Sequence, residues 1–128
     1  YISKTHVDKY RSFWKVITYS ASFSGSSGFG KRFIGDPNTL YNKSCISFST
    51  RRQEQAQTWF SYMNTKFVNF MLSLRKSTHN ITNKKIVSWI PLVPLDRKWT
   101  DEDVFNHFNL PFDIRTIINN AHINYEKY

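Results

Sequence analysis

The chain has 128 residues, of which 40% are hydrophobic and 17% aromatic, and its formal net charge is +9. This length and composition fit one domain with its own buried core, and they exclude an intrinsically disordered chain. No apolar run approaches the ~18 residues of a membrane-spanning helix, and the first residues lack the apolar core of a signal peptide. The excess of Lys and Arg favours a polyanionic partner, either nucleic acid or an anionic membrane surface.

The first half of the chain predicts three strands. Residues 14–20 alternate and are rich in β-branched and aromatic side chains, as in a half-buried strand. A Gly/Ser loop, a short strand at 31–35 and a turn at 36–38 follow, and then a strand at 43–50 with Cys45 or Ile46 and Phe48 facing inward. The single cysteine, Cys45, cannot form an internal disulfide, so we expect a small buried side chain and a cytoplasmic location.

The strongest periodicity follows these strands. Apolar residues recur at steps of three and four from Ala56 to Leu74, which predicts one long amphipathic helix of about 24 residues, or ~36 Å. Thr50 and Gln53 match a capping box at its start, and the helical spacing places Trp59 and Phe67 in the core. The opposite, polar face would carry Tyr62, Lys66, Asn69, Ser73 and Lys76.

The last third predicts an apolar segment and two short helices. Residues 85–95 contain Pro91 and Pro94, which suit an edge strand that covers the core. Thr100 is the expected N-cap of one helix, and another should start near Pro111. The expected fold is therefore α+β, a small mostly antiparallel sheet packed on one long helix, with two short C-terminal helices, in a single domain spanning residues 1–128.

Residues 25–32, "GSSGFGKR", lie one residue from a phosphate-binding P-loop. Arg32 stands where that loop needs Ser or Thr, and Gly35 and Pro37 prevent the helix that must follow. A loop that delivers Lys31 and Arg32 to a phosphate backbone is the preferred interpretation. The four histidines are scattered, so no metal site is expected, and capping explains the acidic residues at 101–103.

The basic residues are unevenly distributed and are interleaved with side chains that can bond phosphates or base edges. The candidate phosphate contacts are Lys31, Arg32, Lys43, Arg51, Arg52, Lys66, Arg75 and Lys76, and the candidate base-reading residues are Asn38, Thr39, Thr78, His79 and Asn80. No catalytic residue is assigned, because the expected strands carry almost no acids to hold a divalent ion.

Two segments, "YMNTKFVNFMLSLRKSTHN" and "IPLVPLDRKWTDEDVFNHFNL", resemble the C-terminal region of adenine-specific DNA methyltransferases of restriction-modification systems, including those fused to a nuclease. Upstream, "KRFIGDPNTLYNKSCISF" and "WKVITYSAS" resemble that family's turn and strands, so the likeness covers about residues 14–118. The chain departs from the family pattern at Val68, Asn69 and His79.

This resemblance implies a target recognition domain, which grips double-stranded DNA while a separate domain of the same parent chain transfers the methyl group. The catalytic motifs of that partner domain are missing here, so S-adenosylmethionine is implied for the parent and no cofactor for this fragment. The start "YISKTHVDKY", without Met, agrees with a piece excised from a longer chain. Two alternatives remain open: a catalytic fragment of a restriction endonuclease, and a protein-interaction domain whose basic face is incidental.

Overall fold

A computed structural model of the chain describes residues 13–19, 28–41, 45–75, 88, 90–123, 125 and 127–128. Three strands form an antiparallel sheet in the order β2-β1-β3, with β1 (Trp14–Tyr19) in the centre, β2 (Arg32–Gly35) on one side and β3 (Cys45–Thr50) on the other. Val16 of β1 lies opposite Ile34 and Phe48, so three apolar side chains meet on one face. The three strands fall where their β-branched and aromatic residues predicted them.

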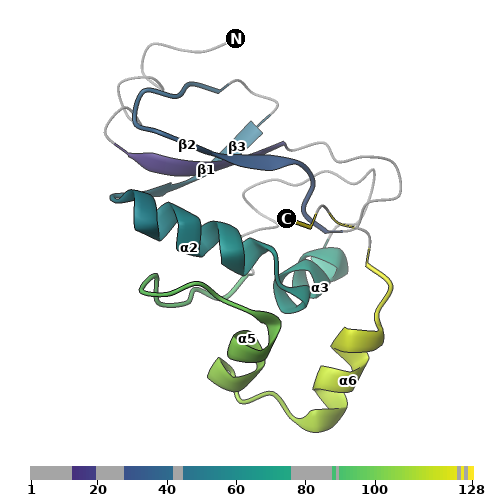
Figure 1. Cartoon of the computed structure of the whole chain (residues 1–128). Helices are drawn as coiled ribbons and strands as arrows, with labels where there is room; N and C mark the ends of the chain where they lie inside the picture. Colours follow the sequence, from purple (N-terminus) through teal and green to yellow (C-terminus); the bar gives the residue numbers. More distant parts are fainter. Residues whose placement is uncertain are drawn as a thin grey trace.

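The helices cover that face in two layers (Figure 1). Helices α2 (Gln53–Met63) and α3 (Lys66–Arg75) follow β3, and α2 packs against all three strands. Helices α5 (Asp101–His107) and α6 (Phe112–Asn120) lie against α3 on the side away from the sheet. The α+β class with an antiparallel sheet is thus confirmed.

The single long helix was a wrong prediction, because the helix ends at Met63 and a new one begins at Lys66. At the break, the Thr65 hydroxyl donates to the Tyr62 carbonyl oxygen at 2.8 Å. The first amide of α3, Lys66 N–H, donates to Asp101 Oδ1 at 2.6 Å. A carboxylate at a helix N-terminus accepts an unpaired amide and suits the helix dipole, so a residue 35 positions away caps α3.

The break also changes which side chains face the core. Tyr62 and Asn69, expected on the polar face, are fully buried, whereas Leu74, expected to face inward, is 64% exposed. Trp59 and Phe67 lie in the core as predicted. The prediction assumed one continuous helical repeat, but the break changes the direction of the side chains that follow it. The predicted core and polar faces are therefore wrong at Tyr62, Asn69 and Leu74.

Two smaller expectations also need correction. Gln55, not Gln53, caps α2: its Oε1 accepts from the Arg51 and Arg52 amides at 3.1 and 3.2 Å. Within residues 88 and 90–95 there is no strand, although Ile90 and Val93 are buried in the core as a covering segment requires. Cys45 is a strand residue, half-buried rather than buried, and burial raises the pKa of its thiol.

Aromatic rings connect the layers. The ring of Phe48 on β3 lies 5.3 Å from that of Trp59, which lies 5.4 Å from that of Tyr62. The Tyr62 ring contacts Trp99, and its hydroxyl donates to the Pro91 carbonyl oxygen at 2.6 Å. Burial raises the pKa of Tyr62, so the hydroxyl stays protonated and keeps donating. This chain of rings fixes the segment before α5 on α2.

Candidate nucleic-acid interface

The structure brings four candidate contacts to one end of the sheet. Trp14 pairs with Thr50 of β3, and the neighbouring Lys15 pairs with Gly35 of β2, so β2 ends where β3 ends. The turn after β2 and the residues after β3 therefore lie at the same end, on either side of β1. We call this set the sheet-end group; it consists of Asn38, Thr39, Arg51 and Arg52.

Hydrogen bonds made by the side chains of Asp36 and Lys15 fix the turn after β2. Asp36 Oδ1 accepts from the Asn38 amide at 2.9 Å and from the Thr39 hydroxyl at 3.0 Å. Lys15, which is fully buried, donates its Nζ to the carbonyl oxygens of Asp36 and Thr39 at 3.0 and 3.2 Å. Burial lowers the pKa of Lys15, and the nearby Asp36 carboxylate opposes part of that shift. Thr39 Oγ1 is thus engaged inside the turn, whereas the Asn38 side chain is exposed.

Arg51 and Arg52 present their side chains to solvent while their backbone is fixed. Both amides donate to Gln55 Oε1, and both residues are exposed. Two neighbouring guanidinium groups on an anchored backbone suit bidentate contacts with phosphate oxygens. Among the described residues predicted to contact DNA, these two meet that requirement best.

Lys31 and Lys66 lie away from the sheet-end group. Lys31 is exposed and adjoins the opposite end of β1, where its carbonyl oxygen accepts from the Tyr19 amide at 3.1 Å. Lys66 starts α3, is half-buried, and donates its Nζ to Asn119 Oδ1 at 3.5 Å. Arg75 is the last residue of α3, and only its backbone is described.

Arg32 is not a phosphate contact in this structure, which corrects the sequence interpretation. Its side chain is 2% exposed. The guanidinium lies 5.0 Å from the ring centre of Phe60 and 4.8 Å from that of Tyr128. Its Nη2 donates to Asn64 Oδ1 at 2.7 Å, and Asn64 also bonds the backbone N–H and carbonyl oxygen of Tyr128. Alternation along β2 points this side chain inward, so we remove Arg32 from the proposed contacts.

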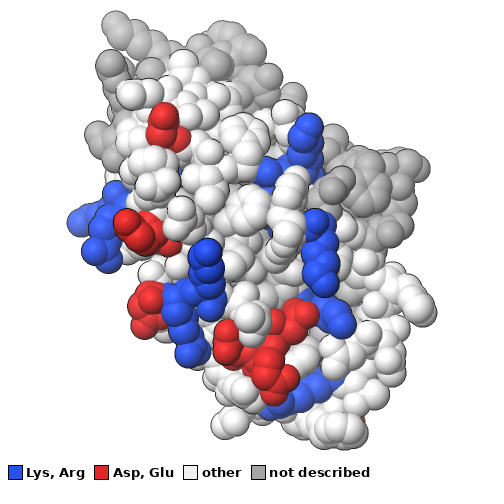
Figure 2. All heavy atoms as spheres, viewed as in Figure 1, with Lys and Arg blue, Asp and Glu red and all other residues white. Residues whose placement is uncertain are grey.

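The remaining candidates lie outside the described residues: Lys43, Lys76, Thr78, His79 and Asn80. Seven of the eighteen Lys and Arg, but only two of the nine Asp and Glu, lie outside the described residues. The described part therefore carries less of the positive excess than the whole sequence does. On the face in Figure 2, blue and red side chains are mixed on the left and lower part, and a row of blue side chains runs along the right side.

Sequence reasoning did not select three further exposed basic residues, Arg97, Lys98 and Lys127. Arg97 lies over the ring of Trp99 at 4.4 Å. Arg97 and Lys98 belong to a run of three charged residues between Pro94 and the N-cap Thr100. This charged run after a proline indicates an exposed loop, and it could have identified both residues. Lys127 follows no pattern that we recognise in the sequence.

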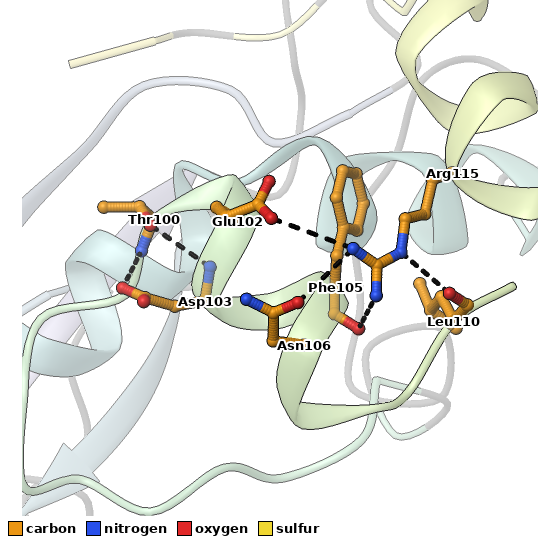
Figure 3. Close-up of polar contacts among 7 residues, drawn as sticks. All are labelled: Thr100, Glu102, Asp103, Phe105, Asn106, Leu110 and Arg115. Carbon is orange, nitrogen blue, oxygen red and sulfur yellow. Dashed lines mark hydrogen bonds and ion pairs between the residues drawn. The ribbon is translucent and has the colours of Figure 1, made fainter. Parts of the chain in front are cut away.

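Arg115 is basic but structural (Figure 3). Its Nε donates to the Leu110 carbonyl oxygen at 2.7 Å and its Nη2 to that of Phe105 at 3.3 Å. Nη1 donates to Asn106 Oδ1 at 3.3 Å and lies 3.8 Å from Glu102 Oε1. Its bonds therefore join α6 to α5 and to the loop between them, and they leave little of the guanidinium for a ligand.

The acidic residues at the start of α5 have a structural role as well. Thr100 Oγ1 accepts from the Asp103 amide at 3.2 Å, and the Thr100 amide donates to Asp103 Oδ2 at 3.1 Å, which confirms the predicted N-cap. The bonds from Thr100 hold the pKa of the Asp103 carboxyl below its usual value. Within the described ranges, no three His, Cys, Asp or Glu side chains are grouped as a metal would need.

Of the described helices, none combines the length and apolar character that crossing a membrane requires. Comparisons with protein family models, with curated proteins and with solved structures give no match. The likeness to adenine-specific DNA methyltransferases therefore rests on the sequence motifs alone.

Proposed function

We propose that this chain is a domain that binds double-stranded DNA and selects the target site of a restriction-modification adenine methyltransferase. The domain carries no catalytic residues of its own. Methyl transfer from S-adenosylmethionine would take place on another domain of the parent, in the cytoplasm, where the target adenine is turned out of the duplex.

The observation that carries this proposal is the ordered pair of motifs at 62–80 and 90–110. In the structure the described parts of the two motifs adjoin each other: Asp101 of the second caps α3 in the first, and Trp99 of the second packs on Tyr62 of the first. These contacts between the two motifs explain why both motifs occur in one chain. They stabilise the fold, and the proposed DNA contacts lie on other residues.

Charge supplies the second support. The protein carries +9, and Lys31, Arg51 and Arg52 are exposed at the two ends of the sheet. Basic groups of this kind bind phosphates without regard to sequence and fix the register of the protein on the duplex. Asn38, exposed at the same end of the sheet as Arg51 and Arg52, is the described side chain best placed to bond a base edge.

A mobility-shift titration with a mixed-sequence duplex at low salt tests this function. We expect a shifted complex, and the absence of a complex would favour a protein-interaction domain. The same preparation incubated with supercoiled plasmid and Mg²⁺ should leave the plasmid intact. Cleavage would identify a nuclease fragment and contradict the proposal.

A further inference from the structure

The outer edge of β3 carries backbone groups that point away from the sheet. The central strand bonds its neighbours alternately, and the bond from Tyr19 N–H to the Lys31 carbonyl oxygen fixes this alternation. Tyr19, Ile17 and Lys15 therefore bond toward β2, while Thr18, Val16 and Trp14 bond toward β3. The β3 partners of the second set are Ile46, Phe48 and Thr50. The amides and carbonyls of Ser47 and Ser49 consequently face outward, because neighbouring residues of a strand point their groups in opposite directions.

Two pockets lie along that same edge. One, of about 380 Å³, is lined by Ser47 and Ile46, and the other, of about 200 Å³, by Ser49 and Thr50. Both share Phe48, Trp59 and Leu92, so the two pockets adjoin each other, and we call them together the β3 groove. Its length follows the strand from residue 46 to residue 50.

The β3 groove has the chemistry of a strand-binding site. The rings of Phe48 and Trp59 and the side chain of Leu92, which is 80% exposed, provide apolar surface for alternate side chains of an incoming strand. The outward N–H and C=O groups of Ser47 and Ser49 provide the backbone bonds. Peptides that add to a sheet edge take their affinity from such bonds and their specificity from adjoining pockets.

Charge determines which peptide fits. The groove leads at its Thr50 end to Arg51 and Arg52, both exposed, and the protein as a whole is strongly basic. A peptide with carboxylates at that end would complement the two guanidinium groups, and a basic peptide would be repelled. Glu54, the second residue of α2 and two residues from Arg52, is the exposed acidic group closest in sequence, and its single charge does not offset both arginines.

We propose that the β3 groove binds an extended acidic peptide, which adds to β3 as a fourth strand and places its carboxylates at Arg51 and Arg52. This goes beyond DNA binding, and it gives the two arginines a second anionic partner. Peptide and duplex would therefore compete for the sheet-end group.

Two six-residue peptides, which match the six residues of β3, test the proposal. In both, Val and Thr alternate, and a Glu pair stands at the N-terminal end in one and at the C-terminal end in the other. We expect one of them to shift the ¹⁵N–¹H resonances of Ser47 and Ser49 and to slow exchange of those amides. The preferred peptide then reports whether the added strand runs antiparallel or parallel to β3. The preferred peptide can be N-methylated on either of its two alternate sets of residues. Methylation of the set that faces β3 should weaken binding at least about tenfold, because it removes the backbone donors, whereas methylation of the outward set should weaken it less.

Leu92→Asp is the matched protein variant. Because Leu92 is exposed, this change leaves the fold intact, and it should weaken peptide binding about tenfold while leaving duplex binding unchanged. Unchanged Ser47 and Ser49 resonances with both peptides would overturn the proposal. So would a dimer whose formation alone protects these amides, or the same shifts produced by a single-stranded oligonucleotide in place of the peptide.

Discussion

Asn69 joins three parts of the fold, and its replacement gives the sharpest stability prediction. Its Oδ1 accepts from the Phe29 amide at 2.8 Å, and its Nδ2 donates to the carbonyl oxygens of Met63 and Thr65 at 2.9 and 2.8 Å. The side chain is fully buried. It thus ties the segment before β2 to the break between α2 and α3.

Asn69→Leu keeps the approximate volume of the side chain and removes its polar atoms. The Phe29 amide and the Met63 carbonyl oxygen would lose these partners inside the protein, whereas the Thr65 carbonyl oxygen keeps the bond from the Asn69 amide. An unsatisfied buried group costs about 1–3 kcal/mol, so the free energy of unfolding should fall by about 2–6 kcal/mol. This is a large part of the ~5–15 kcal/mol that holds a domain together.

Urea denaturation followed by circular dichroism measures this loss, and hydrogen exchange at the Phe29 amide locates it. Asn120→Leu is the control, because Asn120 is exposed at the end of α6 and its replacement should change stability by less than about 0.5 kcal/mol. If Asn69→Leu unfolds at the same urea concentration as the wild type, the three bonds do not stabilise the helix break and our account of it is wrong.

Three further changes test other contacts. Thr100→Ala should cost about 1 kcal/mol through loss of the N-cap. In an NMR titration it should raise the pKa of Asp103 only part of the way toward its usual value, because the bond from the residue-100 backbone N–H remains and only the side-chain bond is lost. The wild type keeps the stability from this low pKa at pH above the usual value and loses it as the pH falls, so the variant should lose less stability over that pH range. Arg115→Met should cost about 2 kcal/mol in urea denaturation through its bonds to Leu110 and Phe105, whereas Glu102→Gln should cost under about 0.5 kcal/mol, because that ion pair is exposed; equal losses would contradict this division. Gly28→Ala should lower the melting temperature, since the added Cβ would lie 2.5 Å from Asn69 Oδ1 and 2.7 Å from Tyr125 Cβ; an unchanged melting temperature would show that the segment moves without cost.

The sequence predicts local elements well where local chemistry forms them. The strands at 14–19, 32–35 and 45–50, the turn at Asp36 and the Thr100 cap all depend on residues close to one another along the chain. The break at Asn64 and Thr65 contains neither Gly nor Pro, and its cap comes from Asp101. Asp101 lies too far along the chain to be part of the helical pattern at 56–74. Periodicity alone therefore predicts a helix that continues through Asn64 and Thr65.

The candidate site shows the same limit. Arg51 and Arg52 are exposed, as a polar pair before a helix suggests, but Arg32 lies next to Lys31 and yet faces inward between two rings. One of those rings belongs to Tyr128, which is 96 residues from Arg32. Side-chain direction in a short strand is set by such distant partners. A basic pair in a loop therefore does not predict two phosphate contacts.

The salt dependence of duplex binding tests the DNA-binding account most directly. Fluorescence anisotropy between 50 and 200 mM salt should give a linear fall of log affinity with log salt for the wild type. In the variant Arg51→Ala with Arg52→Ala the slope should be smaller by about 1.8, since each phosphate contact contributes about 0.9, and this corresponds to ~12-fold less affinity lost over that range. Lys98→Ala with Lys127→Ala removes the same charge from residues outside the proposed contacts and should keep the wild-type slope. A wild-type affinity insensitive to salt, or equal slopes in the two double variants, would contradict the account.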